Sequence, residues 1–265
     1  MRDKLIFTGQ LLFTLLVAAF LIVPAVLSMM AGVTVNYFRG ISSGVTLQWV
    51  GQVWELYADT IGRSFLIAGS ALVVTLIVGV PAAYALHLRG GRLARVIDEI
   101  ITLPLAIPGL AIALGLLLTY NGFSDFRRSW LFILVGHVVF TLPFMVRSVM
   151  AIFSAIDVKT LDEGAASLGA SPWQRFVNVI VPNARPGILA GALMVVTLSL
   201  GEFNLTWMLH TPLTKTLPVG LADSYASMRL EVASAYTLVF FVMIIPLLVA
   251  MQVFATWGEA AGARK

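Results

Sequence analysis

Long apolar stretches alternate with short polar segments along this chain. Six stretches contain the roughly 20 mainly apolar residues that a helix needs to cross a bilayer: residues 5–30, 62–86, 100–120, 130–153, 187–209 and 234–257. The polar segments between them cover residues 31–61, 87–99, 121–129, 154–186 and 210–233. The pattern predicts an all-α integral membrane protein, with six transmembrane helices in one domain over residues 1–265.

The composition supports a membrane location. Of the 265 residues, 59% are hydrophobic and 11% are charged, whereas a soluble domain carries about a quarter charged residues. The chain contains no cysteine, which excludes a disulfide framework, a thiolate metal site and a cysteine nucleophile. The first apolar stretch lacks a small-residue cleavage pattern, so we expect it to be retained as a membrane helix.

The basic residues favour one orientation. If the N-terminus is inside, the cytoplasmic segments hold Arg2, Lys4, Arg89, Arg92, Arg95, Arg147, Lys159, Arg175, Arg185, Arg264 and Lys265. The outer segments then hold the smaller set of Arg39, Arg63, Arg127, Arg128, Lys215 and Arg229. Because basic residues concentrate in cytoplasmic loops, we expect both termini and the 154–186 segment to be cytoplasmic.

Prolines occur inside three predicted spans. The third contains Pro104 and Pro108 followed by Gly109, the fourth contains Pro143 and the sixth contains Pro246. Each proline frees a backbone carbonyl that a neighbouring helix or water must satisfy. Two interpretations are open: broken helices that line a cavity, or unbroken membrane helices in which proline is simply common.

The segment between the fourth and fifth spans has a helical pattern of its own. Its apolar positions recur at three- and four-residue spacing, which is typical of an amphipathic helix: they are Val158, Leu161, Ala165 and Leu168. Gly169 suits a helix C-terminus with positive φ. Ser171 and Pro172 suit the N-cap and first position of a second helix that ends at Pro182. The pattern predicts two short helices joined by a glycine turn at the inner membrane surface.

This segment resembles the EAA loop in the permease subunits of bacterial ABC importers. The family pattern is E-A-A, three residues, G, nine residues, I-x-L-P. Glu163, Ala165, Gly169 and Pro182 occupy the E, second A, G and P positions. The chain departs from the pattern at the first A, the I and the L, where it has Gly164, Val179 and Val181.

The resemblance extends over about residues 62–257 and implies a type I ABC importer permease in the bacterial inner membrane. Such a subunit forms half of the translocation pathway. It works with two ATPase subunits, a second permease that is homologous or identical, and an extracytoplasmic solute-binding protein. ATP and magnesium bind to the ATPase, so the resemblance implies no cofactor in this chain and no nucleic-acid partner.

In this family the loop, here residues 157–182, docks onto the ATPase. The resemblance therefore implies ATPase-coupling roles for Asp162, Glu163, Gly164, Ala165, Ser167, Leu168, Gly169 and Pro182. From periodicity alone, the alternative is a connecting loop with an interfacial helix. The sequence around residues 197–202 is similar to permeases for polyamines, aminophosphonates, ferric ion or related small solutes, which does not identify the substrate.

Glu202 is an acidic residue within the fifth predicted span. Inserting such a residue at a span centre costs about 3 kcal/mol, and it usually faces a bundle interior or a wet path. On a continuous helix Ser199, Glu202 and Thr206 share one face, and we expect this face to line the translocation route. The alternative is a structural Glu202, bonded to a neighbouring helix or to the paired permease. The Gly187–Gly191 spacing in the same span would allow close helix approach.

His137 and Thr141, one turn apart in the fourth span, are a second candidate pair for the route, although a lone histidine there is more often a packing residue. A rival function is an ion-coupled secondary transporter with Glu202 as the carrier group. The sequence contains no H-E-x-x-H motif, no Walker-type glycine loop and no Cys/His cluster. We therefore expect no catalytic residue and no metal site.

Overall fold

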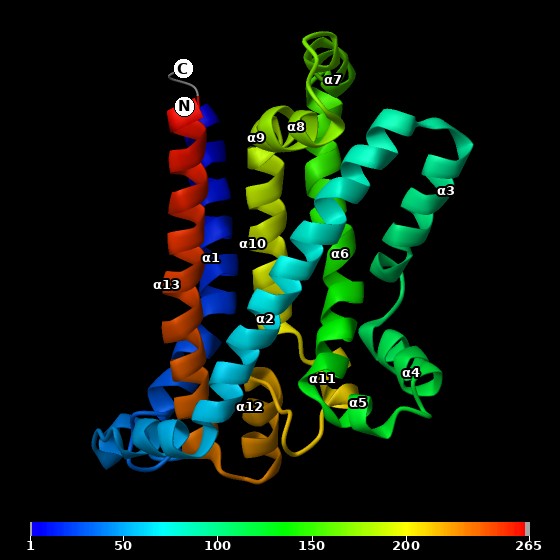
Figure 1. Ribbon diagram of the computed structural model, residues 1–265. Helices are drawn as coiled ribbons and strands as arrows, with labels where there is room; N and C mark the ends of the chain where they lie inside the picture. Colours follow the sequence, from blue (N-terminus) through cyan, green and yellow to red (C-terminus); the bar gives the residue numbers. More distant parts are fainter. Residues whose placement is uncertain (1, 263–265) are drawn as a thin grey trace. The chain divides into compact units, whose positions relative to one another are not determined.

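The computed structural model describes residues 2–262 of the chain, and this part is almost entirely helical. Within it there is no β-strand, and an isolated antiparallel bridge joins Thr34 and Val45. Four helices are long and apolar enough to cross a membrane (Figure 1). These are α1 (Arg2–Ala31), α2 (Gln48–Arg89), α6 (Trp130–Ala155) and α13 (Leu230–Gly262).

Two bent pairs of helices complete the candidate spans. In the first, α3 (Gly91–Thr102) and the turn η2 (Leu103–Leu105) meet α4 (Gly109–Thr119) at 108°. In the second, the run of α8 (Pro172–Arg175), η3 (Phe176–Ile180) and α9 (Val181–Asn183) meets α10 (Arg185–Gly201) at 74°. Counting each pair as one span gives up to six, and the predicted all-α membrane architecture is confirmed.

Several predicted boundaries are wrong. The helix α2 begins inside the predicted outer segment 31–61, and α3 occupies the predicted loop 87–99. The polar segments further along contain α5 (Ser124–Arg128) and α12 (Leu217–Ala226), and the short η1 (Gly40–Ser43) precedes α2. Hydropathy marks the apolar part of a helix, and it misses the amphipathic or polar turns by which a helix extends beyond the lipid.

The third span is not one straight helix over residues 100–120. The chain turns between Leu103 and Pro108, where the two prolines lack the N–H that would continue a helix, and Pro108 is extended (φ −57°, ψ 138°). The broken-helix interpretation is thus confirmed for this span. It is wrong for the fourth and sixth, because Pro143 and Pro246 lie inside the continuous helices α6 and α13.

The chain packs as two compact units, and the single domain expected from the sequence stays a prediction. The first unit combines residues up to 59 with 220–245. Within it, the Tyr57 and Tyr236 rings meet edge to face at 4.9 Å, and Ser224 Oγ donates to Tyr57 Oη at 3.0 Å. A Cβ at Gly32 would overlap the backbone of Ser234 and Ala235, so glycine is needed where this turn meets α13.

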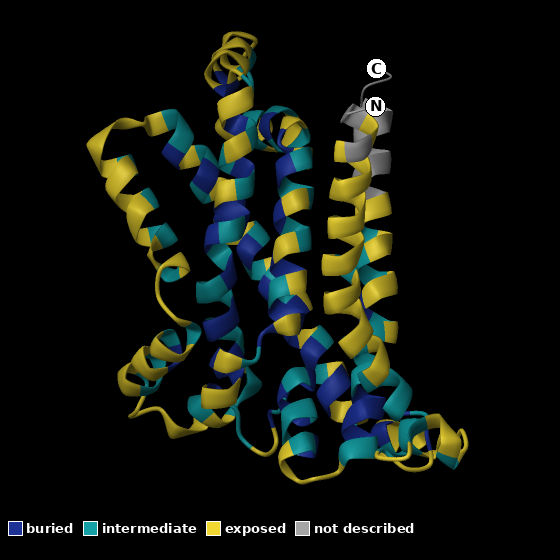
Figure 2. Ribbon diagram, turned by 180° about the vertical axis from the view of Figure 1, so that it is seen from behind, coloured by how far each residue is buried: buried dark blue, intermediate teal, exposed yellow. Residues whose placement is uncertain are grey.

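The second unit contains residues 60–219 and everything from 246 onward. Its core is the packing of α6 against α10, where Figure 2 shows buried residues gathered on both helices. Gly187 and Gly191 are buried in this contact. A Cβ at Gly187 would lie 2.6 Å from the Ser148 carbonyl oxygen, and one at Gly191 would lie 2.7 Å from Met145 Sδ. The predicted close approach is confirmed, and it is made with α6.

Candidate coupling segment and buried polar network

The polar segment begins with a capped helix, α7 (Val158–Ser167). Asp157 is its N-cap, and the Asp157 carboxylate accepts hydrogen bonds from Thr160 Oγ1 at 2.6 Å and Thr160 N at 3.1 Å. These bonds, the side-chain bond foremost, lower the pKa of the Asp157 carboxyl. Since a lowered pKa belongs to a carboxylate stabilised in the folded state, the cap is formed at neutral pH and weakens as acid protonates it.

The glycine turn after α7 has the predicted geometry. Gly169 has φ +83°, the left-handed conformation that glycine adopts without strain. Gly169 N donates to Ala166 O and Ala170 N donates to Ala165 O, at 2.9 and 3.1 Å. These two bonds form a Schellman motif, which satisfies the last carbonyls of α7 and ends the helix.

The second helix starts as predicted and ends differently. Ser171 is the N-cap and forms a capping box with Gln174, and Pro172 takes the first helical position. The prediction that this helix ends at Pro182 is wrong, because it runs on to Asn183. The π-helical turn η3 precedes Pro182, and such wider turns accommodate a residue that cannot donate its N–H to the usual carbonyl.

Asp162 lies on the buried side of α7. It is 7% exposed, and its Oδ1 accepts a 2.5 Å hydrogen bond from the Tyr84 hydroxyl of α2. Its Oδ2 pairs with Arg175 Nη1 of α8, also at 2.5 Å. One carboxylate therefore joins three helices, and both of its oxygens are satisfied.

The predicted apolar face of α7 is right for Val158 and wrong for Leu161 and Leu168. The side chains that α7 buries are Val158 and Asp162, whereas Leu161 is 37% and Leu168 is 88% exposed. The helical periodicity of the sequence puts Asp162 mostly on the side opposite the apolar positions, because periodicity does not reveal that Tyr84 and Arg175 satisfy the buried carboxylate. Arg175 entered the sequence argument only as a positive charge, and Tyr84 did not enter it, since no local signal marks either as a partner of Asp162.

The outward side of α7 and its turn is a mixed surface. Among the predicted coupling residues, Glu163, Gly164, Ser167, Leu168 and Gly169 are exposed, Ala165 and Pro182 are half-buried, and Asp162 is buried. Trp173, just past the turn, is 72% exposed. We call the exposed set Glu163, Gly164, Ser167, Leu168, Gly169 and Trp173 the outer edge. Two large apolar side chains beside a carboxylate on a polar segment are a combination typical of a protein contact.

The fifth predicted span is interrupted at Glu202. The helix α10 ends at Gly201, Glu202 is extended (φ −70°, ψ 122°), and α11 covers Asn204–Leu209. Ser199, Glu202 and Thr206 therefore do not lie on one face of a continuous helix, and that prediction is wrong. The interruption contains no proline, so nothing in the local sequence indicated it.

The Glu202 carboxylate caps the start of α11. It accepts hydrogen bonds from the backbone N–H groups of Leu205 and Thr206 and from the Thr206 hydroxyl, each at 2.8 Å. A helix begins with unsatisfied N–H groups and a partial positive charge, so an ionised acid is well placed there. Glu202 is 9% exposed, and its partners are backbone N–H groups and a hydroxyl in place of a cation.

His137 of α6 joins both sides of the interruption. Its Nδ1 lies 2.7 Å from Ser199 Oγ of α10, and its Nε2 lies 2.8 Å from Thr206 Oγ1 of α11. Thr141 Oγ1 donates to the His137 carbonyl at 2.7 Å. The structure thus brings the five predicted pathway residues into one buried cluster, which we call the polar network: His137, Thr141, Ser199, Glu202 and Thr206.

A further polar contact links the broken third span to α6. Arg147 Nη2 lies 3.2 Å from Asp98 Oδ2 of α3, a pair that the sequence did not indicate. Among the described residues, no group of three or more His, Asp or Glu side chains is arranged to hold a metal ion.

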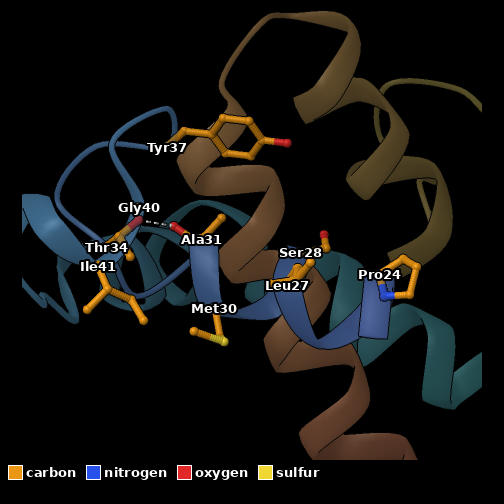
Figure 3. Close-up of a pocket in the computed structure, with 9 residues that line it drawn as sticks. All are labelled: Pro24, Leu27, Ser28, Met30, Ala31, Thr34, Tyr37, Gly40 and Ile41. Carbon is orange, nitrogen blue, oxygen red and sulfur yellow. Dashed lines mark hydrogen bonds between the residues drawn. The ribbon is translucent and has the colours of Figure 1, made fainter. Parts of the chain in front are cut away.

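A separate cavity lies in the first unit, where α1 leads into the following turn. Its volume is about 610 Å³, and Figure 3 shows its lining. The lining residues are Pro24, Leu27, Ser28, Met30, Ala31, Thr34, Tyr37, Gly40 and Ile41. None of these nine residues is charged.

Comparison with known proteins identifies the family of this chain. The family model described as "Binding-protein-dependent transport system inner membrane component" matches residues 75–259. The chain belongs to this family. It is therefore a multi-pass inner-membrane protein and a permease subunit of an ABC importer, and the rival interpretation as an ion-coupled secondary transporter is set aside.

Curated relatives of this permease have named transport systems. The chain is 26% identical over 246 residues, 92% of each chain, to a putative 2-aminoethylphosphonate transport system permease, PhnV, of Salmonella choleraesuis (strain SC-B67). It is 29% identical over 211 residues to the molybdenum transport system permease ModB of Azotobacter vinelandii, covering 74% of this chain and 92% of ModB.

Solved structures show the same fold. A chain of a bacterial alginate ABC transporter, in complex with an alginate pentasaccharide-bound periplasmic protein, matches with a TM-score of 0.70 and 18% identity, over 96% of this permease and 93% of that chain. A chain of the inward-facing MetNI methionine ABC transporter matches with a TM-score of 0.63 and 17% identity, over 79% and 97%.

Proposed function

We propose that this permease couples to a separate ATPase through residues 157–182. The observation that supports this most directly is the division of α7 into two sides. Asp162 and Val158 bind it to the rest of the unit, while the outer edge is left uncovered with Glu163 and Leu168 exposed. An ATPase can dock on α7 and move it only if the helix is attached to the permease on one side and exposed on the other.

Each predicted coupling residue has a role in this proposal. Glu163 supplies a charge, Leu168 and Trp173 supply apolar area, and Gly169 supplies the turn that places them side by side. Gly164 and Ala165 add little or no side-chain bulk to the surface. Ser167 Oγ donates a hydrogen bond to the Gly164 carbonyl at 2.8 Å. Asp162 joins the segment to α2 and α8, and Pro182 is half-buried near the end of the second helix.

The orientation follows from the same proposal. An ATPase that uses cellular ATP lies in the cytoplasm, so the end of α6 that leads into α7 is inside, and the other end, beside α5 and α11, is outside (Figure 1). Most of the 17 basic residues lie in the segments that this orientation makes cytoplasmic, so their distribution favours the same orientation, with both termini inside. ATP and magnesium bind to the ATPase, and this chain has no cofactor or catalytic residue of its own.

The remaining partners are a second permease and a solute-binding protein. The family description names dependence on a binding protein, and the alginate transporter was solved with a periplasmic one. A permease of this kind forms half of the pathway, so a second copy or a homologous chain completes it.

We place the polar network beside the pathway as its structural support. All five side chains are buried, and the hydrogen bonds among them and to the backbone of α11 hold α10 and α11 together at the interruption. This role matches the structural alternative for Glu202 better than a role in carrying solute.

The transported solute is proposed by likeness to the relatives. We propose a small polar solute, with 2-aminoethylphosphonate as the first compound to test, because a permease named for it aligns over 92% of this chain. For each candidate solute, uptake is compared between cells that express the transporter and cells that lack this chain. Uptake that requires this chain identifies the solute as a substrate, and equal uptake excludes it.

Co-purification tests the coupling proposal. The tagged chain is purified from its native membranes beside a Glu163→Arg variant, with Asp125→Arg as the matched control, since Asp125 is an exposed acid at the opposite end of α6. We expect an ATPase with the unmodified chain and the control, and its loss with Glu163→Arg, because charge reversal at an interface costs several kcal/mol. An ATPase retained by Glu163→Arg would contradict the proposed contact.

A further inference from the structure

Asp162 differs from the other acids of the coupling segment. Asp157 and Glu163 are exposed, whereas Asp162 is buried and bonded through both oxygens. A buried, doubly bonded carboxylate between three helices cannot contact an ATPase that docks on the outer edge. Its position points to a mechanical role.

Non-helical residues separate α7 from the helices on either side. At its start Ile156 is extended (φ −119°, ψ 152°), so α7 does not continue the α6 helix. At its end the chain turns at Gly169. The residues that α7 buries are Val158 and Asp162. Because α7 is not helically continuous with α6 or α8, its buried side chains are a direct route by which a displacement of α7 can reach the other helices.

The contact at Asp162 leads directly into the membrane helices. Tyr84 belongs to α2, and its ring packs 5.4 Å from Phe176 of η3 and 6.4 Å from Phe153 of α6. Arg175, the other partner, belongs to α8, which leads through η3 and α9 to α10. One carboxylate on α7 is therefore linked to α2, to α6 through the Tyr84 ring, and to the chain that enters α10.

We propose that Asp162 is the positioning residue that transmits movement of α7 to α2 and α8. When the ATPase displaces the outer edge, the Tyr84 and Arg175 bonds make α7, α2 and α8 move together. Without these bonds the ATPase still docks and hydrolyses ATP, but less of the displacement reaches the spans. This inference rests on the proposed coupling to an ATPase and adds how the movement leaves the docking surface.

The test uses the whole transporter, purified with its ATPase and binding protein and reconstituted in vesicles. Solute uptake and ATP hydrolysis are measured together for Asp162→Asn and Tyr84→Phe, with Asp125→Asn as the matched control. Asparagine keeps an acceptor for Tyr84 and removes the charge that pairs with Arg175. Tyr84→Phe keeps the ion pair and removes the hydroxyl bond.

We expect Asp162→Asn to retain the ATPase and to lower uptake per ATP hydrolysed by about tenfold, within the usual range of coupling between sites. Tyr84→Phe should lower the same ratio by a smaller factor, and Asp162→Glu should restore part of it. In the double variant, Asp162→Asn with Tyr84→Phe, the ratio of uptake to hydrolysis should fall by less than the product of the two single factors, because both bonds belong to the same carboxylate.

Three results would overturn the inference: an unchanged ratio in both variants, an equal loss of uptake and hydrolysis, or loss of the ATPase from the Asp162→Asn complex. If Asp162→Asn does not assemble, Tyr84→Phe decides, since it leaves the charge paired, and an unchanged ratio there overturns the inference. A native chain that brings down no ATPase would instead refute the proposed coupling itself.

Discussion

At the scale of single residues, the buried acids of this permease have different neutralising partners. Asp162 is paired with Arg175 and bonded by Tyr84, whereas Glu202 is bonded by two backbone N–H groups and a threonine hydroxyl. The first arrangement joins separate helices, and the second stabilises a break within one span.

The role of Glu202 leads to a stability prediction. In Glu202→Gln the amide NH2 cannot accept a hydrogen bond, so at least one of the donors at the start of α11 loses its partner, at a cost of about 1–3 kcal/mol. We expect a lower unfolding temperature in detergent than for the native protein. Glu55→Gln is the control, since Glu55 is exposed on α2. Equal unfolding temperatures for native protein and Glu202→Gln would refute the capping role.

The residues also differ in how far the sequence could predict them. Ser171, Pro172 and Gly169 act through local backbone geometry, and their roles as N-cap, first helical residue and left-handed turn followed from residue type. The partners of Asp162 lie 78 positions away at Tyr84 and 13 positions away at Arg175. No periodicity records such a contact, so the sequence placed Asp162 on the wrong side of α7.

At the scale of elements, breaks decide how well hydropathy predicts the spans. A broken third span was one of the two interpretations that Pro104 and Pro108 left open, and the span bends there by 108°. The fifth is interrupted at Glu202 without a proline, through a carboxylate that caps the following helix. A proline can be recognised in the sequence as a possible break. An acid inside an apolar stretch cannot, because in the sequence an acid that caps a new helix looks the same as an acid on the face of a continuous helix.

The contact between α6 and α10 allows a prediction about glycine. Gly187→Ala would place a methyl group 2.6 Å from the Ser148 carbonyl oxygen, so the helices must separate, which costs about 1–3 kcal/mol. Gly115→Ala is the matched control, because Gly115 lies in α4 with nothing near its added methyl group. Thermal unfolding should show a loss for Gly187→Ala and no loss for Gly115→Ala. A Gly187→Ala protein as stable as the control would mean that the helices do not meet at this glycine.

At the scale of the whole molecule, the apolar pattern was enough to predict the class of protein. The composition, the long apolar stretches and the polar segment at 157–182 indicated a membrane permease, and the family match over residues 75–259 confirms it. The sequence does not show how the chain divides into two compact units, because each unit combines two segments that lie far apart in the sequence.

Site-directed crosslinking can show whether the outer edge contacts an ATPase. The chain has no cysteine, so a single Leu168→Cys substitution gives one reactive site on a residue that is 88% exposed. Leu213→Cys, 80% exposed in the loop before α12, is the control. We predict that a thiol crosslinker in native membranes joins residue 168, and not residue 213, to an ATP-binding protein. Failure to capture an ATPase from residue 168, or equal capture from both positions, would contradict it.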